Sequence, residues 1–437
     1  MTLKSIAAIA IGFSSVAYAD DTGATLSGIT LYGTVDVGVT YQTHGVPENA
    51  YAPQGTEYLV SKSSNASTFA LAENGMGNSK IGLKGVELLE DGWSALFKVE
   101  TGFNPASGQV SDSLRSIAGQ NGVPLTQQTA SADSSRAGQA FNQDAFVGIT
   151  HARWGTLTFG RQTTLQTDEI SVYDPQNGAY AFSMLGYSGS GSGSGATEDL
   201  RLDNMVKYGV GLGPLHVGLM YQFAGTLGRN DDAIAADIGG DYEGLSVDAV
   251  ATHKKGGVTV SALTAAQVAL EPAESLAATV SDNTSYSFLA RYSLDTIKVY
   301  GGYDYIRYAN PSSPLPAGTQ DIGGYDLSVV SNTAYTKNKI LQLAWVGARY
   351  SLTPTVELAG AWYRSAQNSF RGNGCNNTSA VSCSGQTNAV SLTVDWHMSK
   401  RFDTYVGAMY SQAVGGMASG YLHNNTVDPT AGLRFTF

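Results

Sequence analysis

A run of acids stands out as the group of residues best suited to act on charged solutes. These acids occupy the segment Arg161–Asp203 and are Asp168, Glu169, Asp174, Glu198, Asp199 and Asp203, and the strand-like runs around it carry several Lys and Arg residues on one face. Acids and bases that face each other across a narrow aqueous gap create a transverse field, which orients dipolar solutes and selects ions by sign. The chemistry predicted here is selection by charge, in which no covalent bond changes.

The same segment has no strand or helix period, and it contains the run GYSGSGSGSG. Long segments without secondary structure are unusual in compact domains and are commonly functional or disordered. If the flanking strands close into a barrel, this segment is expected to fold inside and narrow the opening. The alternative is a mobile acidic loop on the surface, which composition alone favours.

The elements on either side of the segment show the period of two that is typical of β-strands. In Ser27–Tyr41 the residues Ile29 and Leu31 share one face, and Tyr32 and Thr34 share the other. Further strands are predicted for Ser79–Glu87, Trp93–Gly102, Gln143–Thr150 and Thr156–Arg161, and more follow to the end of the chain. The region 254–282 is ambiguous and is predicted as a loop.

Composition supports an all-β class and excludes one kind of partner. The chain has 52 Gly, 24 Tyr and only 14% charged residues, a mixture that suits strands and tight turns better than helices. Its net charge of -11 and pI near 5.0 argue against nucleic acid as a partner, because phosphate binding needs a basic face.

The first residues predict export. Residues 1–19 combine Lys4, an apolar run from Ile6 to Val16 and the small residues Ala17 and Ala19, which is the pattern of a cleaved signal peptide. The apolar run is too short for a spanning helix, which needs about 20 residues. Removing this segment takes away Lys4 and makes the net charge more negative by one.

The remaining chain, residues 20–437, is predicted to form a single transmembrane antiparallel β-barrel of about 16 strands. Long and short connections alternate along it, as they do in bacterial outer-membrane barrels, which have an even number of strands. Aromatic residues near strand ends are expected to form girdles at the membrane interfaces. They are Tyr32, Tyr41, Trp93, Trp154, Tyr208, Tyr221, Tyr292, Tyr350, Tyr363, Trp396 and Tyr410.

Four stretches carry a resemblance to a known family. They are GITLYGTVD after the signal peptide, SKIGLKGVELLEDGWSALFKVE, AFVGITHARWGTLTFGRQ, and the final alternating strand GLRFTF with Phe437 at its end. In this order, over nearly the whole mature chain, they resemble the Gram-negative general porins, which are sixteen-stranded outer-membrane trimers. The resemblance implies passive diffusion of ions and small hydrophilic solutes, without a cofactor or bound metal and without enzyme activity.

The resemblance also implies which residues form the pore constriction. In this family the third long loop enters the barrel and faces a ladder of bases. This places Asp168, Glu169 and Asp174 on the loop, opposite wall bases that all share the polar face of their strands. The wall bases are Lys80, Lys84, Lys98, Arg201 and Lys207.

Other implied features concern assembly and partners. Arg161 has the outward parity and is similar in place to residues that hold a neighbouring subunit in the trimer; the alternative is displacement into the lumen by a β-bulge. Phe437 is expected to act as an assembly signal for the outer-membrane assembly machinery. Outer-membrane lipid and lipopolysaccharide are expected to surround the barrel.

Two departures from the family pattern favour cations over anions. Gln143 and Asp144 precede AFVG where many of these porins have Arg, and Thr34 and Asp36 follow LYG where a base is expected. With fewer wall bases and a negative net charge, cation preference is predicted.

The cysteines Cys375 and Cys383 lie close together in a polar stretch. Because an exported protein meets an oxidising compartment, a local disulfide is expected.

Alternatives remain open at this point: a substrate-selective channel, an outer-membrane barrel enzyme and a secreted β-rich adhesin. The motifs G-x-S-x-G, G-x-x-x-x-G-K-[ST] and H-E-x-x-H are absent from the sequence, and its six His residues have no ligand spacing.

Overall fold

The computed structural model describes residues 24–26, 28–52, 56–131, 139–185, 199–225, 231–272, 274–322, 324–370 and 380–437. The predicted signal peptide, residues 1–19, lies outside them, as does the whole Gly/Ser run, residues 186–195. No helix among the described residues is long and apolar enough to cross a membrane.

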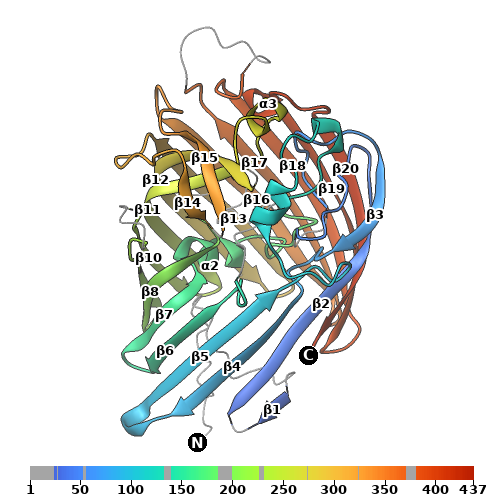
Figure 1. Ribbon diagram of the computed structural model, residues 1–437. Helices are drawn as coiled ribbons and strands as arrows, with labels where there is room; N and C mark the ends of the chain where they lie inside the picture. The colour runs from blue at the N-terminus through green and yellow to red at the C-terminus, as the bar shows by residue number, and fades with distance from the viewer. Residues whose placement is uncertain are drawn as a thin grey trace, which may run out of the picture.

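Sixteen antiparallel strands close into a barrel, as the sequence predicts (Figure 1). Each strand pairs with the next one around the barrel, and β2 pairs with β20 to close it. The barrel strands are β2 (Ile29–Gln42), β4 (Lys80–Leu88), β5 (Trp93–Gly102), β6 (Ala145–His151), β7 (Gly155–Thr163), β8 (Arg201–Leu212), β9 (Leu215–Gln222), β10 (Ala233–Tyr242), β11 (Leu245–Ser261), β12 (Ser275–Leu294), β13 (Ile297–Ala309), β16 (Lys339–Thr353), β17 (Val356–Gln367), β18 (Gly385–His397), β19 (Phe402–Gly415) and β20 (Asn425–Thr436).

Short strands and helices extend the barrel at its ends. The strands β1 (Ala24–Leu26) and β3 (Thr68–Glu73) pair with opposite ends of β2, and β15 (Tyr325–Ser331) pairs with both β14 (Thr319–Ile322) and β12. The helices are α1 (Ser113–Ala118), α2 (Leu165–Val172), α3 (Ala265–Val268), η1 (Glu90–Gly92), η2 (Leu125–Gln127) and η3 (Gly416–Ala418). Tight turns gather at one end of the barrel and long connections at the other (Figure 1).

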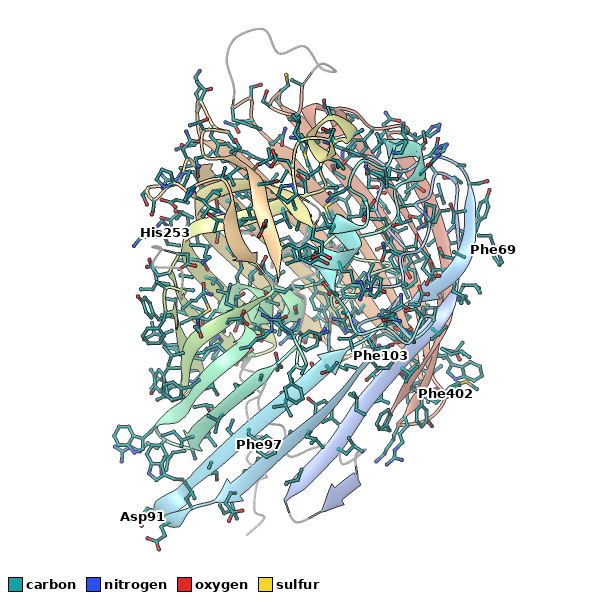
Figure 2. All side chains as sticks on the ribbon, viewed as in Figure 1. Phe69, Asp91, Phe97, Phe103, His253 and Phe402 are labelled. Carbon is teal, nitrogen blue, oxygen red and sulfur yellow. The ribbon has the colours of Figure 1, made fainter. Side chains whose placement is uncertain are left out.

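The outer surface is apolar because every second side chain of each strand points away from the barrel. For example, Val147 on β6 and Leu219 on β9 are more than half exposed, whereas the residues on either side of each one in its strand are less exposed. Figure 2 shows Phe69 and Phe402 projecting from the outer surface and Asp91 at the tip of a tight turn. Exposed apolar side chains in this alternation match a lipid-facing wall.

The prediction of a loop over 254–282 was wrong. Strand β11 continues to Ser261 and β12 begins at Ser275, so that only a short connection containing α3 separates them. A register shift between Lys254 and Gly257 interrupts the pairing, which then resumes. This irregularity breaks the period of two in the sequence, although the two strands stay hydrogen-bonded.

Two of the predicted girdle aromatics point inward instead. The Tyr363 hydroxyl is buried and donates to Asp174 at 2.6 Å, and the Tyr32 hydroxyl donates to Glu100 at 2.9 Å. Both therefore belong to the polar interior of the barrel.

Candidate functional site

The segment after β7 contains a helix, α2, that the sequence did not predict. The hydroxyl of Thr164 caps it by accepting from the Thr167 amide at 3.2 Å. All residues from Leu165 to Ile170 are buried, and the helix packs against β9, β10, β11 and β12. Because these six residues are buried on every face of the helix, although Ser171 after them is exposed, α2 has no separate apolar stripe and its sequence lacks the helical period.

The chain that follows α2 stays against inward-facing side chains of the barrel. Trp345 on β16 donates to the carbonyl of Tyr173 at 2.9 Å, and Gln176 donates to Ser391 on β18 at 3.1 Å. Farther along, the ring of Phe182 packs edge-on against Tyr405 on β19, with 6.1 Å between the centroids. Contacts with the inner wall thus extend from α2 to β19.

Three of the predicted wall bases gather in one group that also holds two acids and a tyrosine. We call it the paired-charge patch, and its members are Tyr32, Lys80, Lys98, Glu100, Asp144 and Arg201. The Asp144 carboxylate lies 2.5 Å from Lys98 Nζ and 3.2 Å from Arg201 Nε. Lys80 Nζ lies 3.1 Å from Glu100, which is fully buried.

Asp144 therefore occupies the centre of the bases. In the sequence, Asp144 was noted only as a position where an expected Arg is absent. In the structure, its carboxylate neutralises two neighbouring bases at once. Glu100 was not among the predicted site residues, although it lies two residues after Lys98 on β5 and so shares its polar face. That alternation was the signal that could have found it.

The remaining predicted bases behave differently from each other. Lys207 Nζ lies 2.7 Å from Asp168 on α2, so this acid of the segment does meet a base of the wall. Both side chains are nearly buried. Lys84 instead lies over the ring of Tyr32, with Nζ 5.3 Å from the centroid.

Asp174 does not face the wall bases as predicted. It is fully buried and accepts hydrogen bonds from the Tyr363 hydroxyl, the Gln176 amide at 3.1 Å and the Gly178 amide at 2.7 Å. Burial raises the pKa of Asp174, and these hydrogen bonds oppose that shift. The residue fixes the chain after α2 to β17.

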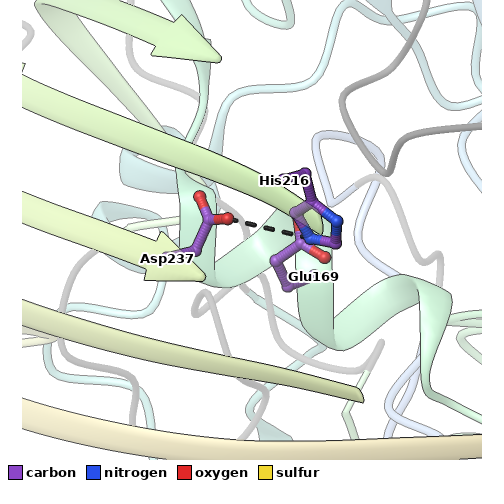
Figure 3. Close-up of side chains that lie close together, drawn as sticks. All are labelled: Glu169, His216 and Asp237. Carbon is purple, nitrogen blue, oxygen red and sulfur yellow. Dashed lines mark ion pairs between the residues drawn. The ribbon is translucent and has the colours of Figure 1, made fainter. Parts of the chain in front are cut away.

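Glu169 belongs to a second group, which we call the acid-rich patch: Glu169, His216, Asp237 and Asp248. Figure 3 shows the first three of these residues. His216 Nε2 lies 2.6 Å from Asp248 Oδ1 and 3.9 Å from Asp237 Oδ2. Burial raises the pKa of Glu169 well above its ordinary value, and the nearby charges of Asp248, Asp237 and Asp168 add to the effect.

His216 has no ligand spacing to these acids along the chain. It comes from β9, whereas Asp237 and Asp248 come from β10 and β11, so strand pairing and not spacing along the chain unites them. Their shared polar parity on three consecutive strands was the available signal.

Arg161 is buried within its own chain. Its guanidinium lies 2.8 Å from Asp203 and donates to the Asn142 carbonyl from two nitrogens. The β7–β8 register shifts between Gly160 and Gln162, so Arg161 stands at the irregularity that the bulge alternative invoked. Its predicted contact with a neighbouring subunit stays a prediction.

The remaining residues that the sequence singled out lie in other parts of the chain. Cys383 is disulfide-bonded, and Cys375 lies outside the described residues, as does Glu198. Phe437 exchanges two backbone hydrogen bonds with Gly33, of 2.9 and 3.0 Å. Asp36 is buried and accepts from the Tyr405 hydroxyl at 2.6 Å and the Met76 amide at 2.7 Å, so this departure from the family pattern supports packing.

Comparisons with known proteins agree with the architecture. The sequence matches the model of the Gram-negative porin family over residues 5–416. It is 27% identical over 247 residues to an outer membrane porin protein of Bordetella pertussis, a match that covers 56% of this chain and 53% of that protein. The match therefore spans about half the length of that relative.

Solved structures share the fold at low sequence identity. An anion-selective porin from Comamonas acidovorans superposes with a TM-score of 0.60 and 17% identity, covering 94% of this chain and 99% of that one. The trimer form of OmpT, an outer membrane protein of Vibrio cholerae, gives 0.57 and 14%, with the same coverage. OmpF of Salmonella typhi in complex with daunomycin gives 0.54 and 14%, covering 94% and 97%.

Proposed function

This chain belongs to the Gram-negative porin family, and we propose that it forms an outer-membrane channel for passive diffusion of ions and small hydrophilic solutes. The observation that carries the proposal is a closed sixteen-stranded barrel with an apolar outer surface and charged groups on its inner wall. A wall of this kind separates lipid from water. Family and fold indicate a channel rather than an enzyme.

The channel is narrowed by α2 and the chain that follows it. Asp168 and Lys207 join this segment to β8, while Asp174 and Tyr363 join it to β17. The segment is thus held on two sides of the barrel, where it reduces the space open to solutes. Charges along the remaining opening orient dipolar solutes and disfavour apolar ones.

We assign the channel a preference for cations. In the paired-charge patch the carboxylates of Glu100 and Asp144 neutralise most of the basic charge, and the acid-rich patch adds acids to the same wall. The porin from Comamonas acidovorans is anion-selective. We therefore base the proposed sign on the balance of charged residues and not on the shared fold.

Assembly follows the family pattern in this proposal. The chain forms a homotrimer, supported by the solved trimer form of the Vibrio cholerae protein, and Arg161 with Asp203 shapes the surface presented to the neighbouring subunit. Outer-membrane lipid and lipopolysaccharide cover the apolar outer surface. The outer-membrane assembly machinery engages the last strand, which ends at Phe437.

The test is single-channel recording in a planar bilayer, with the reversal potential measured in a KCl gradient. We expect ohmic openings in groups of three, and we expect a reversal potential whose sign shows that K⁺ passes more readily than Cl⁻. Correctly folded protein that gives no openings contradicts the channel, whereas openings with a chloride-type potential contradict only the ion preference.

A further inference from the structure

Three residues from three different elements converge on one point of the inner wall. Glu169 comes from α2, His216 from β9 and Asp237 from β10, and one ligand atom from each lies within 4.8 Å of the others (Figure 3). We propose that these residues bind a divalent transition-metal ion of the Zn²⁺ class.

The first support is the state of the two acids. Glu169 and Asp237 are only 1% and 3% exposed. Both oxygens of Asp237 and Oε1 of Glu169 have no hydrogen-bond partner among the described residues. Buried carboxylates without partners are costly, and a bound cation offsets that cost.

The second support is the kind of donor atoms present. A histidine nitrogen combined with carboxylate oxygens suits Zn²⁺ and related transition metals, whereas Ca²⁺ and Mg²⁺ prefer oxygen ligands alone. His216 Nε2 points at the acids, since it lies near Oδ atoms of both Asp248 and Asp237. The metal takes the place of the proton on Nε2, which is released to water.

The separations are compatible with this metal. Zn²⁺ bonds of about 2.0–2.2 Å in a tetrahedron place ligand atoms about 3.4 Å apart. The 3.9 Å between His216 Nε2 and Asp237 Oδ2 closes to this value by a small side-chain rotation. A water molecule completes the coordination, or Asp248 does so after the metal replaces its 2.6 Å hydrogen bond to Nε2 and its carboxylate moves outward.

Gly239 gives His216 and Asp248 the space to meet. It pairs with His216 across β9 and with Asp248 across β11. A Cβ at this position lies 1.5 Å from Asp248 Oδ1 and 2.6 Å from His216 Cε1. An added Cβ therefore displaces the Asp248 carboxylate and the His216 ring from their present positions.

A second group of similar composition supplies a contrast. Asp395, His397 and Asp403 also come within ligand distance of one another, near a tight turn. The guanidinium of Arg434 already lies 2.7 Å from Asp403 and 3.5 Å from Asp395, and the His397 side chain is 42% exposed. That group contains its own cation, so it carries no metal proposal and serves as a control.

Metal binding joins α2 to the barrel wall, because Glu169 lies on the helix and the other ligands lie on strands. It also removes negative charge from the lumen. If the proposed channel function holds, Zn²⁺ lowers the preference for K⁺. The binding itself does not depend on that function and is measured separately.

The experiment is Zn²⁺ titration of the full-length, detergent-folded and chelator-treated protein by calorimetry. We expect one tight Zn²⁺ site per chain, and we expect the affinity to fall at least tenfold in His216→Gln and in Asp237→Asn. Ca²⁺ is expected to bind the wild type less tightly than Zn²⁺. His397→Gln is the control and is expected to bind like the wild type. Heat-modifiable migration in electrophoresis checks that each variant is folded.

Gly239→Ala tests the positioning role while leaving every ligand in place. It is expected to weaken Zn²⁺ binding, whereas Gly301→Ala, at a strand glycine where an added Cβ meets only ordinary contacts, leaves it unchanged. No Zn²⁺ binding by folded wild type, equal affinity in His216→Gln, or loss of binding only in His397→Gln overturns the proposal. If the folded wild type binds Zn²⁺ but gives no channel openings in the bilayer recording, the proposed function is overturned and the metal site is not.

Discussion

The paired-charge patch and the acid-rich patch lie on the same inner wall but differ in how their charges are compensated. In the first, both carboxylates contact bases, and Asp144 contacts two of them. In the second, His216 is bonded to Asp248, while Asp237 and one oxygen of Glu169 lack hydrogen-bond partners among the described residues. One oxygen of Glu100 also lacks a hydrogen-bond partner, but its other oxygen lies near Lys80 and Lys98, whereas no Lys or Arg contacts Asp237 among the described residues. Residue type alone therefore does not assign a role, and only the second patch carries the metal proposal.

Removing the central acid of the paired-charge patch is expected to have the largest effect. Asp144→Asn leaves Lys98 and Arg201 side by side without the carboxylate between them, and breaking such a buried pair costs about 3–5 kcal/mol. Guanidinium unfolding of the detergent-folded protein measures the loss. Glu90→Gln, at an exposed acid in a tight turn, is the matched control. Equal unfolding midpoints for the two variants would mean that the patch is not held by Asp144.

The corresponding change in the acid-rich patch is expected to act in the opposite direction. In the presence of a chelator, Asp237→Asn removes a buried charge whose oxygens have no hydrogen-bond partner among the described residues and whose nearest base, His216, is 3.9 Å away. We expect it to raise the free energy of unfolding by about 1–3 kcal/mol. The same unfolding assay measures this gain. With saturating Zn²⁺ the order reverses, because the metal stabilises the wild type more. A variant that is less stable than the wild type in chelator contradicts the contrast between the patches.

The smallest effect is expected from Tyr32→Phe. It removes one hydrogen bond to Glu100, which keeps its contacts with Lys80 and Lys98, so the loss is about 0.5–1.5 kcal/mol. Tyr286→Phe on the outer surface provides the comparison and is expected to change the midpoint very little. A loss as large as that of Asp144→Asn would show that the hydroxyl, and not the ion pairs, organises the patch.

The barrel could be predicted from the sequence because lipid outside and polar groups inside impose a period of two on each strand. Strand β5 matches its predicted bounds, Trp93–Gly102, and the number of barrel strands is confirmed. The sequence shows no such period where a segment has the same environment on all sides or where the strand pairing is irregular. Residues Leu165–Ile170 of α2 are buried on every face of the helix. The register shift between Lys254 and Gly257 breaks the alternation in the sequence of β11 before that strand ends.

The site was predictable only in part. Parity placed Lys80, Lys98, Arg201 and Lys207 on the inner wall, and Lys207 does meet Asp168 there. Which acid pairs with which base depends on contacts between distant segments. Asp174 bonds to Tyr363 on β17, and His216 meets acids on two neighbouring strands and a helix, so neither arrangement has a signature in local spacing.

The junction of β2 with β20 also governs the order of events while the protein is being made. Thr34 and Thr436 face each other across it, although 402 positions separate them in the chain. Until β20 arrives, the backbone groups along one edge of β2 have no partner, and such an edge readily pairs with other chains. Contacts this distant in sequence also form slowly. A cell that makes this protein must therefore shield the earliest strand from aggregation until synthesis has reached the last one.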